Sequence, residues 1–462
     1  MEEHTVYHRK EAPFDMEETF IQHSRRKVVA IVFLSLFSYL LFTELVNHSL
    51  SWTPLTQAIA AADEKKVLTQ SDFEYIGAFL LPTSGVNGDP IWGQGLTHCY
   101  VNGELRMFAY AWNAAGPQNM YEVRVPAPSL TSSPTATVVR NWGDVAGNKR
   151  IGQMFGLYWD EQDQRMYWND QNVYNTCCPD DPGMGYSILN DATGGITPVG
   201  AWRFTGRGTK ATNTCVLPIP QWFADAYTGG MRLGAGCGGY QSIVATGPGH
   251  LGPALTAFSP PDIMTNPDGS SLSFVDLVGY PFQNNPIDCT KRATRDTNYI
   301  DDFDGCDPVN GVGRWSWSDR LWQSAVWIDL PDKSGLVYFA TLAYGREWYE
   351  TSTLHAMGST HWWYVYDPAD LAAVAQGTKE EYEIQAKYTW PVEYPGLSYP
   401  LPRWDGGDPG NLVSGVTYDS LTRRVYVAVR FAGNDGATKV YVYEVNSAFS
   451  NPPSAPTGLR LK

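Results

Sequence analysis

Charged residues are scarce in this chain, making up 18% of its 462 residues. Long solvent-exposed helices need many charged side chains, so such helices should be rare. Acidic residues outnumber basic ones, and the net charge of −15 argues against binding to nucleic acid or to anionic lipid surfaces. The composition therefore excludes nucleic-acid partners and points away from a helical protein.

Signatures of familiar catalytic sites are also missing. Neither a His-x-Glu-x-x-His nor a Gly-x-Ser-x-Gly pattern occurs, and no phosphate-binding loop is present. The chain beyond residue 50 has four histidines, and we expect them to be hydrogen-bonded loop or rim residues: His98, His250, His355 and His361. These absences favour a protein without a catalytic function, so no catalytic residue is assigned from the sequence.

The cysteines exclude two further classes of site. None of the seven lies in a Cys-x-x-Cys pattern, which argues against structural zinc and covalently attached haem. Cys215 with Cys237, and Cys289 with Cys306, would each close a short loop, and disulfides of this kind fit an oxidising compartment. The odd count leaves at least one thiol unpaired.

Residues that favour strands and turns are abundant. Aromatic residues account for 13% of the chain, which also contains 44 glycines and 31 prolines. Aromatic side chains suit strands, and glycine and proline suit the turns between them. The composition predicts an all-β fold.

One strand-turn-strand pattern occurs twice at a distance of 259 residues. In the first copy Gly156–Asp160 is followed, after four residues, by Arg165–Trp168. In the second copy Gly415–Asp419 is followed, again after four residues, by Arg424–Val427. Recurrence of one supersecondary unit indicates a fold built by repetition.

Five copies of a larger unit, each a hairpin followed by a lone alternating strand, extend over the chain, and the copy at Gly239 is looser than the others. They begin at Gly95, Gly156, Gly239, Ser324 and Gly415. This order predicts a β-propeller of about five to seven blades, with a large β-sandwich as the alternative. Long insertions rich in Gly, Pro, Asp and Asn separate the units at 170–185, 203–236, 259–320 and 392–412. We expect Phe73–Leu81 to close the ring in the blade that holds Gly415–Val445.

Several of these motifs together resemble a loose group of exported bacterial propeller-like proteins. The resemblance rests on Tyr75–Phe79 with Pro82, on the Gly-x-x-Tyr/Trp-Asp hairpins and on Trp363–Leu371. It spans most of residues 70–446 and implies the fold and export, but no activity.

The N-terminal segment contains an apolar run behind a basic cluster. Arg25–Lys27 precedes Val28–Phe42, which has no charged residue, and Leu45 and Val46 extend the run. We predict an uncleaved transmembrane signal anchor at 28–46, with the basic cluster in the cytoplasm. The alternative is a cleaved signal peptide with its small-residue site within Ala58–Ala62.

These features predict five regions and one location. The regions are a cytoplasmic segment at 1–27, a transmembrane anchor at 28–46, a linker at 47–69, a propeller at 70–446 and a tail at 447–462. The propeller is expected on the periplasmic side of the inner membrane, with the bilayer as a partner of residues 28–46.

The densest acidic cluster is the candidate metal site. Asp302, Asp304 and Asp307 alternate around Gly305, and hard cations prefer such closely spaced carboxylates. The alternatives are structural calcium and a solvated acidic loop held by a Cys289–Cys306 disulfide. No other cofactor is predicted.

Two functions remain open on the sequence alone. The main prediction is a non-catalytic structural or binding subunit of a larger membrane complex, such as a respiratory or photosynthetic one. Its partners would be other proteins of that complex, with Trp315, Trp317 and Trp404 as interface anchors. The alternative is an exported enzyme that acts on a glycan or similar polymer through acidic residues on one propeller face.

Overall fold

A computed structural model describes most of the chain between Lys65 and Ala448. The described residues are 65–83, 91–111, 118–149, 152–171, 181–207, 212, 214–237, 252–280, 323–350, 353–401, 411–433 and 436–448. All of them belong to the unit Ala60–Lys462. Within these residues no helix is long and apolar enough to cross a membrane, and the predicted anchor at 28–46 lies outside them.

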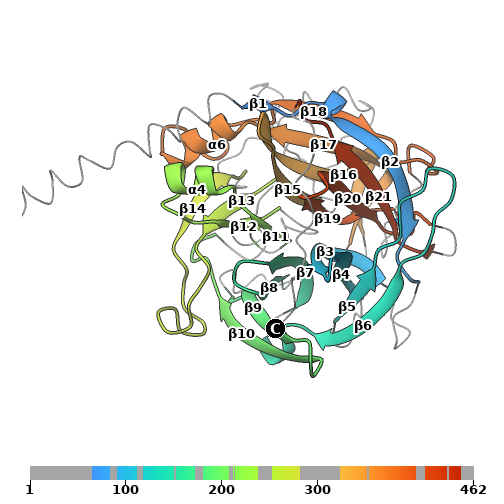
Figure 1. The fold of residues 1–462 in the computed structure, drawn as a ribbon. Helices are drawn as coiled ribbons and strands as arrows, with labels where there is room; N and C mark the ends of the chain where they lie inside the picture. Colours follow the sequence, from blue (N-terminus) through green and yellow to red (C-terminus); the bar gives the residue numbers. More distant parts are fainter. Residues whose placement is uncertain are drawn as a thin grey trace, which may run out of the picture. The chain divides into compact units, whose positions relative to one another are not determined.

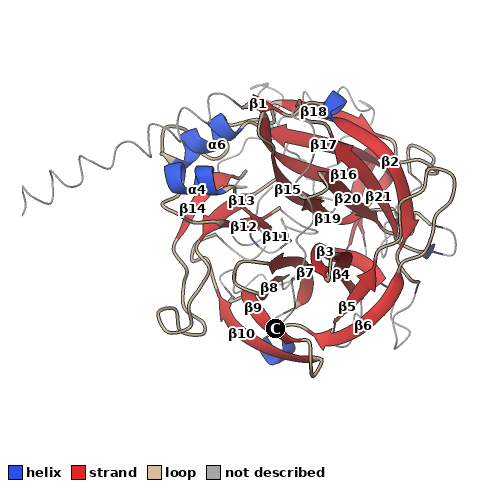
Figure 2. Cartoon of the chain, in the orientation of Figure 1, coloured by secondary structure: helices blue, strands red, loops and turns tan. Residues whose placement is uncertain are grey.

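Five antiparallel sheets are arranged in a ring, which confirms the predicted β-propeller and sets its number of blades at five (Figures 1 and 2). The first blade contains β3 (Ile91–Val101), β4 (Glu104–Ala111), β5 (Asn119–Arg124) and β6 (Thr137–Asp144). The second contains β7 (Gln153–Asp160), β8 (Arg165–Gln171), β9 (Met184–Asn190) and β10 (Gly195–Trp202). The third contains β11 (Cys215–Pro218), β12 (Leu233–Gly236), β13 (Leu255–Phe258) and β14 (Phe274–Val278).

The last two blades include strands from the beginning of the described chain. The fourth contains β15 (Gln323–Asp329), β16 (Lys333–Glu350), β17 (Thr353–Tyr366) and β18 (Tyr388–Val392), with the short β1 (Lys66–Val67) parallel to β16. The fifth contains β19 (Val413–Asp419), β20 (Arg424–Val429), β21 (Lys439–Val445) and β2 (Phe73–Leu80). The α-helices of the described residues are α4 (Gln221–Tyr227) and α6 (Pro368–Ala375), and short 3-10 turns lie at Gln70–Asp72 and Gly147–Lys149.

The core is a ring of layers between neighbouring blades. The first strand of each blade, β3, β7, β11, β15 or β19, contacts the first strands of the two adjacent blades. Five clusters of buried apolar side chains each lie between two adjacent sheets. Because both faces of each sheet are covered, most strand residues are buried.

The ring closes as the sequence predicts. The N-terminal strand β2 pairs antiparallel with β21 over Phe73–Leu80, and so completes the sheet formed by the last three strands of the chain. Because β2 pairs with β21, the two ends of the propeller are joined within one blade and the ring is not left open.

Packing at the axis explains the repeated hairpin pattern. A Cβ atom on Gly415 would overlap the carbonyl oxygen of Gly93 on β3, and a Cβ atom on Gly156 would lie 2.9 Å from the Cα of Cys215 on β11. Glycine therefore permits the first strands to approach closely. The aspartates that end the pattern close its turn, since Asp160 accepts the N–H of Gln162 and Asp419 accepts that of Leu421.

The third blade differs from the sequence expectation. We predicted a looser unit starting at Gly239, but three of the four strands, β11, β12 and β14, lie in the stretches interpreted as insertions at 203–236 and 259–320. Two of these strands are only four residues long, and the Leu-Gly-Ala-Gly of β12 has no polar alternation. Strands this short carry little periodic signal.

The two ends of the ring have different connections. The loop face is defined as the end of the ring at which the first strand of each blade begins. The turn face is the opposite end, at which these strands finish. The turn face has short links such as Asn102–Gly103 between β3 and β4. Each gap in the described residues between Lys65 and Ala448 joins strands at the loop face.

Candidate functional site

Two polar side chains are buried at the loop-face end of the first blade. Tyr110, near the end of β4, lies opposite Gln94 of β3 in the sheet register. Tyr110 is 0% exposed and Gln94 is 1% exposed. The Tyr110 hydroxyl and the Gln94 Oε1 have no hydrogen-bond partner among the described residues. Buried polar atoms normally have a partner, so this pair marks a position where a ligand or solvent group is expected.

A carboxylate of the second blade faces the same position. Asp170 is fully buried near the end of β8, where the N–H of Gly152 donates to its Oδ2 at 3.1 Å. Alternation along the strand places Asp170 on the same side as Trp168, which packs with Tyr110 in the layer between the first and second blades. Asp170 and Tyr110 therefore approach one boundary from opposite blades.

A second carboxylate comes from the last strand of the first blade. Asp144 ends β6 and is partly exposed. Its Oδ1 accepts the N–H groups of Ala146 and Gly147, each at 3.1 Å. These two bonds fix the carboxylate at the start of the connection to the second blade.

The two carboxylates act on the same phenol. The pKa of Tyr110 is raised well above its ordinary value because the hydroxyl is buried, and the negative charges of Asp144 and Asp170 raise it further. Tyr110 is therefore a neutral hydrogen-bond donor under the electrostatic influence of two acidic groups. Two carboxyl groups and a neutral phenol are suited to proton transfer and to binding hydroxyl groups.

An aromatic–cation pair lies at the junction of the fifth and first blades. The guanidinium of Arg430 lies 3.7 Å from the ring centroid of Trp92, and both side chains are buried. Ser414 donates a hydrogen bond of 2.7 Å to the carbonyl oxygen of Trp92. Contacts with the fifth blade thus fix the start of β3, the strand that carries Gln94.

The histidines that the structure describes in full are hydrogen-bonded, as the sequence suggests, but one is buried within a strand rather than placed in a loop or at a rim. His361 is 1% exposed on β17, and its ring nitrogens contact the Tyr399 hydroxyl at 2.6 Å and the carbonyl oxygen of Asn411 at 2.7 Å. His98 contacts Thr417 at 2.8 Å near the turn face, away from Tyr110. His250 and the side chain of His355 lie outside the described residues.

The site residues chosen from the sequence fall mostly outside the described parts of the chain. This applies to the calcium candidates Asp302, Asp304 and Asp307, to Trp315, Trp317 and Trp404, and to Cys289 and Cys306. Structural calcium thus stays a prediction. Among the residues that are described, no group of three His, Cys, Asp or Glu side chains could hold a metal ion.

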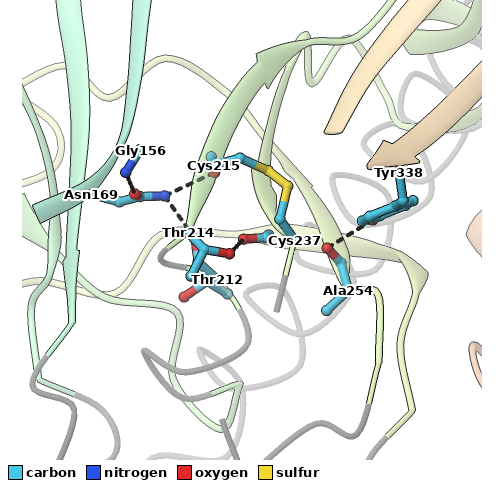
Figure 3. Close-up of a disulfide and its surroundings, with 9 residues drawn as sticks. Gly156, Asn169, Thr212, Thr214, Cys215, Cys237, Ala254 and Tyr338 are labelled. Carbon is cyan, nitrogen blue, oxygen red and sulfur yellow. Dashed lines mark hydrogen bonds between the residues drawn. A yellow bond between two sulfur atoms is a disulfide. The ribbon is translucent and has the colours of Figure 1, made fainter. Parts of the chain in front are cut away.

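The predicted Cys215–Cys237 disulfide is present (Figure 3). It joins the start of β11 to the residue after β12, at the loop-face end of the third blade. Cys99 is a free and buried thiol.

The sequence interpretation missed Gln94, Tyr110, Asp144 and Asp170. Tyr110 lies in an apolar strand and resembles a core residue, and the two aspartates occur singly rather than in a motif. One signal was present, since Asp144 ends β6 and Asp170 lies one residue before the end of β8. Their convergence depends on which blades are adjacent.

The comparisons with known proteins are limited to solved structures. No protein-family model matches the sequence, and none of the curated proteins does. An arabinanase from Bacillus subtilis aligns with a TM-score of 0.34 at 10% identity, over 80% of this chain and 96% of its own. An alpha-L-arabinofuranosidase from Lactobacillus brevis aligns with a TM-score of 0.37 at 10% identity, over 83% and 98%. The GH43_1 enzyme from Xanthomonas citri, in complex with xylose, aligns with a TM-score of 0.36 at 11% identity, over 84% and 91%.

This finding corrects the main functional prediction. The similar structures are glycoside hydrolases rather than subunits of membrane complexes, which contradicts the predicted non-catalytic subunit. At these scores and identities no activity can be carried over to this chain.

Proposed function

We propose that the protein is an exported enzyme that acts on a glycan or a similar polymer at the loop face of the propeller. One observation carries this proposal. Two carboxylates from adjacent blades, Asp144 and Asp170, both act electrostatically on the buried Tyr110 hydroxyl, which has no hydrogen-bond partner among the described residues.

The chemistry of glycoside cleavage accounts for this arrangement. Most glycoside hydrolases use two carboxyl groups, one to protonate the leaving oxygen and one to act as base or nucleophile. When such groups differ in environment, the buried carboxyl commonly acts as the acid and the more solvated one as its counterpart. In this chain Asp170 has the buried position and Asp144 the partly exposed one. We assign them these roles, with Tyr110 and Gln94 as hydrogen-bonding groups for sugar hydroxyls.

Export is part of the proposal. The apolar run at 28–46 behind Arg25–Lys27 supports it, as does the Cys215–Cys237 disulfide, because disulfides persist in oxidising compartments. We retain the transmembrane anchor at 28–46 as the means by which the propeller is held on the periplasmic side of the inner membrane.

The test is a search for turnover with the full chain. The purified protein is incubated with a panel of plant, fungal and bacterial polysaccharides and with aryl glycosides, and new reducing ends are measured. We expect at least one substrate to be cleaved, and we expect Asp144→Asn and Asp170→Asn each to lower the rate by about 10²-fold or more. Asp225→Asn, an exposed aspartate on α4, is the matched control.

Two results would contradict the proposal. One is the absence of cleavage across the whole panel while the protein is folded. The other is cleavage that Asp144→Asn and Asp170→Asn leave unchanged relative to Asp225→Asn.

A further inference from the structure

Asn169 joins three strands from two blades through its side chain (Figure 3). Its Oδ1 accepts the N–H of Gly156 on β7 at 2.7 Å. Its Nδ2 donates to the carbonyl oxygens of Thr212 at 3.0 Å and Cys215 at 2.8 Å. Asn169 is 0% exposed, so these three bonds replace contacts with water.

The neighbouring residue is the buried carboxylate of the proposed site. Successive side chains of a strand point to opposite faces. Tyr167 packs in the layer between the second and third blades, and Trp168 packs in the layer between the first and second. Asn169 therefore anchors the end of β8 on the third blade, while Asp170 projects from the other face toward Tyr110.

The anchor point on the third blade is itself firmly held. Cys215 is bonded to Cys237, and both the N–H and the hydroxyl of Thr214 donate to the carbonyl oxygen of Gly236. Beyond the disulfide, the N–H of Cys237 and the Tyr338 hydroxyl on β16 both donate to the carbonyl oxygen of Ala254. The disulfide thus lies between the second and fourth blades as part of one connected set of hydrogen bonds (Figure 3).

From this geometry we infer that Asn169 is a positioning residue that fixes Asp170 by tying β8 to the disulfide-bonded end of the third blade. The inference deepens the proposed function and rests on it. An asparagine is needed because one side chain must accept from one N–H and donate to two carbonyl groups. Loss of the two donated bonds would let the end of β8 move. A shift of about 1 Å at a reacting group costs on the order of 10²-fold in rate.

The variant that tests the inference is Asn169→Asp, which keeps the shape but replaces the donor by an acceptor that faces two carbonyl oxygens. Asn169→Ser removes the bonds without adding charge, and it serves if the aspartate variant does not fold. Asn102→Asp, at the exposed turn between β3 and β4, makes the same chemical change away from the site. Near-ultraviolet circular dichroism checks that each variant is folded.

Two readouts separate this inference from the proposed function. The first is kcat and KM on a substrate found in the panel, for which we expect kcat to fall by about 10²-fold while KM changes little. The second needs no substrate: it is the rate at which dithiothreitol reduces the Cys215–Cys237 disulfide in the native protein, followed by alkylation and mass spectrometry. We expect Asn169→Asp and Asn169→Ser to speed reduction at least several-fold over the wild type and Asn102→Asp.

The outcomes are distinct. If the folded wild type cleaves nothing, the proposed function fails, and the link from Asn169 to catalysis fails with it. If the wild type is active but kcat is unchanged in the Asn169 variants, the positioning role is overturned and the proposed function stands. If reduction of the disulfide is no faster in these variants, Asn169 does not hold that end of the third blade and the inference is overturned.

Discussion

Tyr75 and Tyr443 lie opposite each other in the fifth blade, with ring centroids 5.5 Å apart, although they belong to the first and last long strands described. This pair is part of the contact by which β2 closes the ring. Deleting residues 70–82 should therefore unfold the propeller, because the fifth sheet loses a strand and exposes an edge. Circular dichroism during heating checks this, and a melting temperature equal to that of the full chain would contradict closure by β2.

A milder change tests the same closure. Phe79 is 0% exposed in the layer between the fifth and first blades, whereas Glu74 is exposed on the same strand. Phe79→Ala should lower the free energy of unfolding by about 3–5 kcal/mol, as for other large core side chains. Glu74→Ala should change it by less than about 0.5 kcal/mol. Urea denaturation of both variants gives the comparison.

Burial of His361 predicts a loss of stability in acid. Its Nε2–H donates to the carbonyl oxygen of Asn411. Because burial keeps the ring neutral, Nδ1 then accepts from the Tyr399 hydroxyl. Burial lowers the pKa of His361 to about 3, against an unfolded value of about 6.5. The folded state binds the proton less readily than the unfolded state. The contribution of the neutral His361 ring to the free energy of unfolding is therefore complete above pH ~6.5 and is lost as the pH falls toward 3. The slope reaches about 1.4 kcal/mol per pH unit.

The measurement is urea denaturation of the wild type and of His361→Gln between pH 7 and pH 4. The wild type should lose more stability over this range than the variant, which lacks the titrating group. Curves that decline in parallel would show that His361 does not resist protonation.

Close packing of the first strands leaves no room for a side chain at Gly415. A Cβ atom there would overlap the Gly93 carbonyl oxygen and lie 2.7 Å from the Leu96 nitrogen, both in backbone that cannot easily move. Gly415→Ala should destabilise the protein by about 1–3 kcal/mol through overpacking. Gly195→Ala is the control, because its nearest neighbour is the Thr193 hydroxyl at 3.1 Å. Equal melting temperatures for the two variants would contradict close packing at the axis.

The N-terminal sequence of the mature protein tests whether the predicted anchor is retained. Residues 28–46 form a long apolar run after Arg25–Lys27, and the small-residue stretch Ala58–Ala62 lies well beyond it. We expect the mature chain to keep this segment and to fractionate with membranes. N-terminal sequencing that begins at Ala61 or Asp63 would instead establish a cleaved signal.

Much of the fold was predictable because four blades contain hairpins with clear periodicity. The copies at Gly95, Gly156, Ser324 and Gly415 all correspond to observed hairpins, and the closing strand was assigned correctly. The third blade was misplaced because its strands are short and separated by α4 and long connections. Alternation cannot distinguish a strand of four buried residues from a loop.

The candidate site was harder to predict than the fold. Asp144 ends β6 and Asp170 lies one residue before the end of β8. The two carboxylates act on the same Tyr110 only because their blades are neighbours and both strands finish at the loop face. Asn169 carries no motif, and its role follows from three hydrogen bonds to residues that include one 46 positions away. Sequence patterns report local structure, whereas a site of this kind depends on the contacts between repeats.

The attachment of the chain before β2 has a mechanical consequence. Lys66 and Val67 pair with β16 of the fourth blade, and Lys65 forms an ion pair of 2.7 Å with Asp329. Asp72 then contacts Lys333, before β2 enters the fifth blade. A pull transmitted from residues before Lys65 would load these contacts first. The strand that closes the ring would bear tension only after the fourth-blade contacts had given way.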